Sequence, residues 1–351
     1  MKKTLLISIV IAAFAPQCRA QRAAGNFTYR LPKTEVWLSL LVEKATFTPG
    51  KLSAYAGLYF KTEAGQAVTE QYAIVDAAMW TEGIADDERE YEIMLDKKHS
   101  IISIDCGTDG TLHAINTTGE QAAVRPVFVS SPRQKQPNPY DYMSQDILAA
   151  ENMPMMARLV AQEIYDIRES RRELSRGEAE YMPKDGEQLR LMLAELDTQE
   201  RALMRMFTGT TVRDTMEYRV HFVPQNDASE QMLFRFSKHY GIVAADDLSG
   251  SPYYAVTRAD GTFAEATDEG DDVKRVKDDM VVTVCVPGRI EVTVSDGQRG
   301  STPLCSLATY AAQYGYGQEL SGALFGKKFT SKIVLDGATG AVKSLTTEPL
   351  E

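Results

Sequence analysis

The chain of 351 residues has few of the residue types that build metal and cofactor sites. It has four histidines, and no two are three or four residues apart, the spacing that places two ligands on one helix face. Its four cysteines form no Cys-x-x-Cys pair, and the sequence has no glycine-rich phosphate loop and no Gly-x-Ser-x-Gly turn. We therefore predict no metal ligand, no cofactor and no catalytic residue of the common designs.

Basic residues are also in short supply. The chain has 38 Lys and Arg against 49 Asp and Glu, for a net charge of −11, and no basic block offsets this locally. Such a chain repels phosphate backbones, which excludes nucleic acid as a partner. The acidic stretch 268–279 could offer oxygen ligands to calcium, but Lys274 and Arg275 interrupt it and its spacing is not that of an EF-hand. We interpret it as a solvated loop.

Long hydrophobic runs are absent except at the N-terminus. Leu5 to Ala15 follows two lysines and precedes Ala20, the layout of a secretory signal peptide over residues 1–20. The run is too short to remain as a membrane anchor, and no later segment approaches spanning length. We therefore expect cleavage after Ala20 and a periplasmic or extracellular protein. Lipoprotein anchoring at Cys18 is the less favoured alternative, because Gln17 fits a bacterial lipobox poorly.

Cysteine pairing is limited by the same cleavage. It leaves Cys106, Cys285 and Cys305, an odd number that allows at most one disulfide bond. A Cys285–Cys305 bond is one possibility, and structural thiols within strands are the favoured alternative.

Hydrophobic periodicity divides the mature chain into four parts. Alternating apolar residues predict β-rich regions over 21–130 and 209–351, which flank a Pro- and Gln-rich linker at 131–145 and a helical hairpin at 146–208. The fold class is thus α+β, with mostly antiparallel β regions flanking a long antiparallel helical hairpin. Within the second β region, we expect Val281 to Val286 to turn at Pro287-Gly288 into a second strand.

The helical hairpin carries the strongest pattern in the sequence. Asp185 is suited to cap the second helix, while Gly177 and Gly209 are suited to end the first and second helices. Apolar residues recur at three- and four-residue steps along both helices, namely Met156, Leu159, Val160, Ile164, Ile167 and Leu174, then Leu189, Met192, Leu193, Leu196, Leu203, Met206 and Phe207.

Tyrosines beside glycines are the remaining candidates for a binding surface. Tyr310, Tyr314 and Tyr316 lie near Gly315 and Gly317, and a Tyr253-Tyr254 pair precedes them in the chain. Such rings can stack on sugars or pack a partner protein, but residues of this kind more often cover the edge of a sheet, which we favour.

Several short segments resemble a known family in their order along the chain. They include Phe27–Thr34, Thr48–Gly50, Glu163–Arg168, Pro183–Gly186 and Ala312–Gly315. Together they resemble an uncharacterised family of exported proteins of the Bacteroides group of gut anaerobes, domain of unknown function family 4831. The resemblance implies export and a shared architecture, and it carries over no active site.

The missing catalytic motifs favour a non-enzymatic cell-envelope protein that binds or scaffolds a partner, either an envelope protein or a glycan. The charged faces of the helical hairpin would serve as its docking arm. The alternative from another class is a glycan-active hydrolase with an Asp/Glu pair, which requires a pocket holding two carboxylates. With 49 acidic residues, the sequence nominates no such pair. A purely structural subunit or a homo-oligomer is the third possibility.

Overall fold

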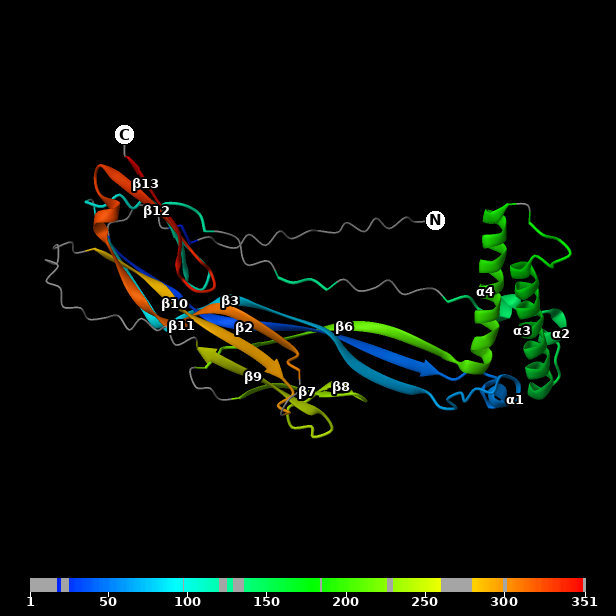
Figure 1. Ribbon diagram of the computed structural model, residues 1–351. Coiled ribbons are helices and arrows are strands. Elements are labelled where there is room, and N and C mark those ends of the chain that lie inside the picture. The colour runs from blue at the N-terminus through cyan, green and yellow to red at the C-terminus, as the bar shows by residue number, and fades with distance from the viewer. Residues whose placement is uncertain are drawn as a thin grey trace, which may run out of the picture.

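The computed structural model describes residues 18–19, 25–96, 98–119, 125–128, 136–183, 185–225, 230–259, 280–298 and 302–349. They form an elongated molecule with a β body and with the α-helices gathered at one end (Figure 1), whereas the short helix η3 (Gly322–Phe325) follows β11 in the body. The acidic stretch 268–279 and, apart from Cys18 and Arg19, the expected signal peptide lie outside the described residues.

Three antiparallel sheets make up the β body, which confirms an α+β fold with antiparallel sheets. The first has the order β3-β2-β6, the second β11-β10-β9-β7-β8 and the third β1-β4-β5-β12-β13. The strands are β1 (Cys18–Arg19), β2 (Gly25–Thr48), β3 (Thr69–Leu95), β4 (Ile104–Cys106), β5 (Leu112–Ile115), β6 (Thr210–Phe222), β7 (Gln231–Ser237), β8 (Gly241–Val243), β9 (Ser251–Ala259), β10 (Val281–Ser295), β11 (Cys305–Ser321), β12 (Phe329–Leu335) and β13 (Val342–Pro349).

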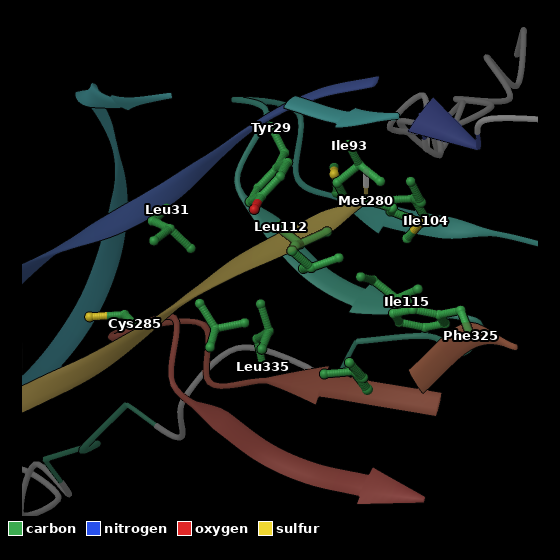
Figure 2. Packing of buried hydrophobic residues seen from close by; sticks show 14 of the residues in the cluster. Tyr29, Leu31, Ile93, Ile104, Leu112, Ile115, Met280, Cys285, Phe325 and Leu335 are labelled. Atoms are coloured by element: carbon green, nitrogen blue, oxygen red, sulfur yellow. The ribbon is translucent and has the colours of Figure 1, made fainter. Parts of the chain in front are cut away.

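Two hydrophobic cores lie along the body, and the long strands contribute to both. Tyr29 and Leu31 of β2 belong to the far core, together with residues of β4, β5, β10 and β12. Figure 2 shows their side chains with those of Leu112 and Leu335. Further along β2, the alternating residues Val36, Leu38, Leu40 and Val42 are buried in a middle core against the second sheet, because side chains alternate between the faces of a strand. The two β-rich regions of the sequence therefore share their cores.

Strand β10 corrects the expected turn at Pro287-Gly288. The strand is continuous, and its register against β11 shifts between Val286 and Gly288, which is a bulge rather than a hairpin. A Cβ added at Gly288 would lie 2.0 Å from the carbonyl oxygen of Tyr314, so the two backbones approach where only glycine fits. Pro287-Gly288 does interrupt the regular strand geometry. However, β11 pairs with β10 on both sides of it, so the chain continues as one strand with a register shift.

The same register separates the two cysteines that could have formed a disulfide bond. Cys305 lies opposite Val294, whereas Cys285 lies opposite Gly317. The step from Cys285 to Val294 corresponds to about 30 Å of extended strand, which no disulfide spans. Both residues are thiols within strands, as favoured. Burial raises the pKa of Cys305 to about 11, and it also raises the pKa of Cys285 despite the charge of nearby Arg89.

Four α-helices and two 3-10 helices lie at the end of the molecule reached by β2, β3 and β6 (Figure 1). We call this part the helical head. Its helices are η1 (Ser53–Tyr55), α1 (Ala56–Phe60), η2 (Pro139–Tyr142), α2 (Gln145–Leu148), α3 (Met153–Arg176) and α4 (Gly186–Thr208). Asp185 caps α4 by accepting from the amide of Glu187, and Gly177 ends α3 at a left-handed φ of 74°. Both signals behave as expected from the sequence.

The head has a core of its own. Ile164 and Val160 of α3 pack with Leu203 and Phe207 of α4 and with Leu52, which precedes η1. The apolar stripe predicted for α4 is buried only in its C-terminal half, because Met192 is 38% exposed. Part of the expected linker belongs to the head, since η2 lies within it. The guanidinium of Arg205 also donates to the side chain of Gln136, which holds this segment against α4.

Candidate functional site

A row of three aromatic rings crosses the outer face of the first sheet, the face that points away from the middle core. The cross-strand register places Trp80 of β3 and His221 of β6 on either side of Trp37 of β2. The ring centroids of Trp37 and Trp80 are 6.0 Å apart, and those of Trp37 and His221 are 4.7 Å apart, both in stacked orientation. We call these residues the aromatic row. It contains both tryptophans of the chain.

Two carboxylates lie beside the aromatic row, directly opposite each other on β2 and β3. Glu35 is 2.6 Å from Nδ1 of His221, and Glu82 accepts from Nε1 of Trp80 at 2.8 Å. Arg125 also donates to Glu82 at 2.7 Å. Burial raises the pKa of Glu82, but the hydrogen bonds from Trp80 and Arg125 and the Arg125 charge outweigh it and hold that pKa below its usual range.

This carboxylate pair does not have the character of a glycosidase acid and base. A general acid needs a raised pKa so that it is protonated when it meets its substrate, and the pKa of Glu82 is lowered. Both acids are also held by partners, which offsets the repulsion expected of like charges directly opposite in a sheet. Among the described residues, the indole N–H of Trp37 is buried without a hydrogen-bond acceptor.

Two cavities border the Gln71–Ala73 segment of β3. One, of about 320 Å³, lies over the outer face near the head, where Glu43 and Arg213 face each other as an ion pair. The other, of about 460 Å³, lies between β3 and the second sheet, and we call it the interlayer cavity. It is lined by Gln71, Tyr72, Ala73, Ile74, Phe236, Lys238, His239, Tyr253 and Leu304. Neither of these cavities is lined by two carboxylates, so neither supports the hydrolase alternative.

The four histidines are separated in the structure as they are in the sequence. His221 is exposed and hydrogen-bonded to Glu35, and His99 lies 2.7 Å from the carboxylate of Asp96. His113 is partly buried in β5, and His239 lies at the rim of the interlayer cavity. Within the described part of the chain, no three His, Cys, Asp or Glu side chains gather in a geometry that could hold a metal ion.

The tyrosine candidates lie in strands. Tyr310, Tyr314 and Tyr316 belong to β11, the edge strand of the second sheet, which fits the favoured interpretation of sheet-edge residues. Tyr314 is buried, and its hydroxyl donates to the carbonyl of Gln225. Tyr253 stacks on Phe234 with ring centroids 4.8 Å apart and contributes to the interlayer cavity.

Comparison with known proteins identifies the family. A family model described as a domain of unknown function (DUF4831) matches residues 25–343, nearly the whole chain. The chain belongs to the DUF4831 family. No curated protein and no solved structure gave a significant match to this DUF4831 chain. In the described part of the DUF4831 protein, no helix combines the length and the apolar character needed to cross a membrane.

Sequence reasoning missed the aromatic row of this DUF4831 protein. The alternation of β2 already places Trp37 on the face opposite Val36 and Leu38, so a large ring on an outer face was a visible signal. Its neighbours were not visible, because Trp80 and His221 are brought beside it by strand pairing across long sequence separations. Period alone does not fix register.

Proposed function

We propose that this protein is exported by a cleaved signal peptide and acts in the cell envelope as a non-enzymatic binding or scaffolding protein. In this proposal, α3 and α4 form an antiparallel helical hairpin that serves as the docking arm for a protein partner. The ion pairs Arg168–Glu200 and Arg171–Asp197 support the antiparallel arrangement, because residue numbers rise in one helix as they fall in the other.

The observation that carries the proposal is the apolar surface left exposed near the N-terminus of α4. The C-terminal half of the helix is buried in the head, with Leu203 and Phe207 both at 0% exposure. Near its N-terminus, Leu191 is 59% exposed and Met192 is 38% exposed. An apolar surface that continues past the part its own core covers is typical of an interaction site.

The connection between α3 and α4 adds to this surface. Tyr181 is 83% exposed and Met182 is 39% exposed, and both precede the first turn of α4. Tyrosine is enriched in protein interfaces, and the flexible methionine side chain adapts to a partner's shape. We call Tyr181, Met182, Leu191 and Met192 the head tip. Its place at the end of an elongated molecule suits contact with a protein held some distance from the β body (Figure 1).

Site-specific photocrosslinking in the source cells tests the docking arm. A benzophenone amino acid would replace Leu191 in the head tip or, as the matched control, Leu248, which is 84% exposed in the β body. We expect one discrete crosslinked protein from position 191, absent from position 248 and lost when Tyr181→Ser and Met192→Gln are added. The same product from both positions, or none from either, would contradict the docking arm.

Export is tested separately by the mature N-terminus. We expect the protein recovered from the envelope or medium to begin at Gln21, and Cys18→Ala to leave its release and mass unchanged. A lipid-modified N-terminus at Cys18 would instead establish a lipoprotein. An intact N-terminus at Met1 would overturn export altogether.

A further inference from the structure

The walls of the interlayer cavity are joined by contacts within the chain. The amide of Tyr72 donates to the carbonyl of Lys238 at 2.8 Å, which joins β3 to the turn between β7 and β8. The Tyr72 ring lies close to Gly241, where a Cβ would be only 3.0 Å away and φ is +75°. Preformed walls reduce the ordering cost of binding a small molecule.

The floor of the cavity is apolar and aromatic. Ile74, Phe236 and Leu304 line it together with Tyr253, whose ring is held parallel to Phe234 at an interplanar angle of 7°. Its volume of about 460 Å³ falls within the range of small-molecule sites, which are lined mainly by such side chains with a few polar groups for orientation.

The side chains at the rim of the cavity are basic, and its other polar groups are neutral. Lys238 and His239 are exposed at its rim, and no carboxylate is among the described residues that line it. Asp296, which is not among the lining residues, acts electrostatically on Tyr253. Burial, followed by the charge of Asp296, raises the pKa of Tyr253, so its hydroxyl remains a neutral hydrogen-bond donor. A basic rim over an apolar floor is notable in a chain with a net charge of −11.

We propose that the interlayer cavity binds a small carboxylic acid with an apolar or aromatic body. The body lies against Phe236, Tyr253 and Leu304, and the carboxylate faces Lys238 and His239 at the rim. Burial of the body supplies most of the affinity, and the cationic rim selects the sign of the ligand's charge. This site is separate from the head tip, so it stands or falls independently of the docking arm.

Three probes of matched shape test the proposal in the full mature chain. They are 3-phenylpropionate, the neutral 3-phenylpropanol and the cationic 3-phenylpropylamine, each titrated by calorimetry at neutral pH. We expect the carboxylate to bind about tenfold more tightly than the alcohol, and the amine more weakly still. Equal affinities for all three, or a dissociation constant for the carboxylate above about 10 mM, would overturn the proposal.

Variants locate the binding. Lys238→Gln should weaken 3-phenylpropionate about fivefold, the effect of one partly screened charge, and leave 3-phenylpropanol unchanged. Lys327→Gln removes an exposed charge outside the cavity and should change neither affinity. Leu304→Trp fills the cavity and should abolish binding while the far-ultraviolet circular dichroism is retained. Equal effects of the two lysine substitutions, or full binding by the filled cavity, would place the ligand elsewhere.

Discussion

The helical head and the β body are stabilised by contacts of different range. The head core joins residues of only two stretches of sequence, around Leu52 and between Met143 and Phe207. The body joins opposite ends of the chain, as when Tyr29 meets Thr283 and Thr34 meets Ala312. The helices of the head can be predicted from hydrophobic periodicity, because many of their contacts are local. The body depends on strand pairings that no local pattern specifies.

The two regions also differ in how they are connected. The two body cores share β2 and β10, so neither core can open without disturbing the other. The head begins where the paired ends of β2 and β6 stop, with Thr48 opposite Thr210. Just beyond this junction, the amide of Leu52 donates to the carbonyl of Met206 at 2.7 Å. A Cβ at Gly50 would lie 2.1 Å from that same carbonyl oxygen. We therefore expect the head to unfold as a unit of its own, below the melting temperature of the body.

The largest predicted effect removes a ring from the head core. Phe207 is fully buried and packs edge-on against Phe60 with centroids 4.8 Å apart. Phe207→Ala should destabilise the head by about 3–5 kcal/mol, through lost burial and the cavity it leaves. Both tryptophans lie in the body, so helical circular dichroism follows the head while tryptophan fluorescence follows the body.

The Phe207→Ala variant tests whether the head and the body unfold independently. The dichroism transition should move to lower temperature while the fluorescence transition stays in place. Leu191→Ala, at an exposed position of α4, is the control and should move neither. If both signals of Phe207→Ala shift together, head and body form a single cooperative unit.

The second prediction concerns a substitution in the body, at the bulge of β10. Gly288→Ala would place a methyl group against the carbonyl of Tyr314, between strand pairings that hold β10 and β11 together on both sides of the register shift. We expect a loss of about 3 kcal/mol or more in the body, measured by tryptophan fluorescence during urea unfolding, with the head transition unchanged. Gly25→Ala has open space around its Cβ and should be tolerated. Equal stability of the two variants would argue against the close approach.

The sequence predicted the head better than the body for physical reasons. Helix caps at Asp185 and Gly177 act within a few residues of themselves, so their effect can be inferred from neighbours. Hairpins such as that of β4 and β5 are similarly local. The Pro287-Gly288 signal misled because the outcome depended on β11, and the aromatic row was missed because register is a long-range property.

A smaller effect concerns the hydrogen bonds that link the two ends of the chain. The Tyr29 hydroxyl donates to the carbonyl of Thr283 and accepts from its amide, both at 2.8 Å. Tyr29→Phe leaves these two backbone groups without their partner, and we expect a loss of about 2 kcal/mol in the free energy of body unfolding. Tyr310→Phe, at an exposed ring, should cost nothing measurable. Equal urea midpoints for the two variants would contradict the role of Tyr29.

Alkaline unfolding provides a separate test of the same hydroxyl. Burial raises the pKa of Tyr29 to about 12 from an unfolded value of 10.0. The neutral phenol is therefore favoured in the folded state, and its contribution is full below pH 10 and is lost as pH rises from 10 towards 12. The wild-type body should lose more stability than Tyr29→Phe across this interval. Parallel pH profiles for the two proteins would show that Tyr29 ionises as readily when folded.

The smallest effects distinguish charges between the head helices from charges along one helix. Glu200 of α4 accepts from Arg168 of α3 at 2.7 Å, and its second oxygen lies 2.7 Å from Arg171 without hydrogen-bond geometry. This carboxylate is only 12% exposed, so Glu200→Gln should destabilise the head by about 0.5–1 kcal/mol in a dichroism melt. Glu187 pairs with Arg190 on the surface of α4 alone, with 59% and 72% of the side chains exposed. Solvent screens that pair, and Glu187→Gln should leave the melting temperature of the head unchanged. Equal shifts for the two variants would mean that the ion pairs between α3 and α4 add nothing beyond an ordinary surface pair, and that packing alone holds these two helices together.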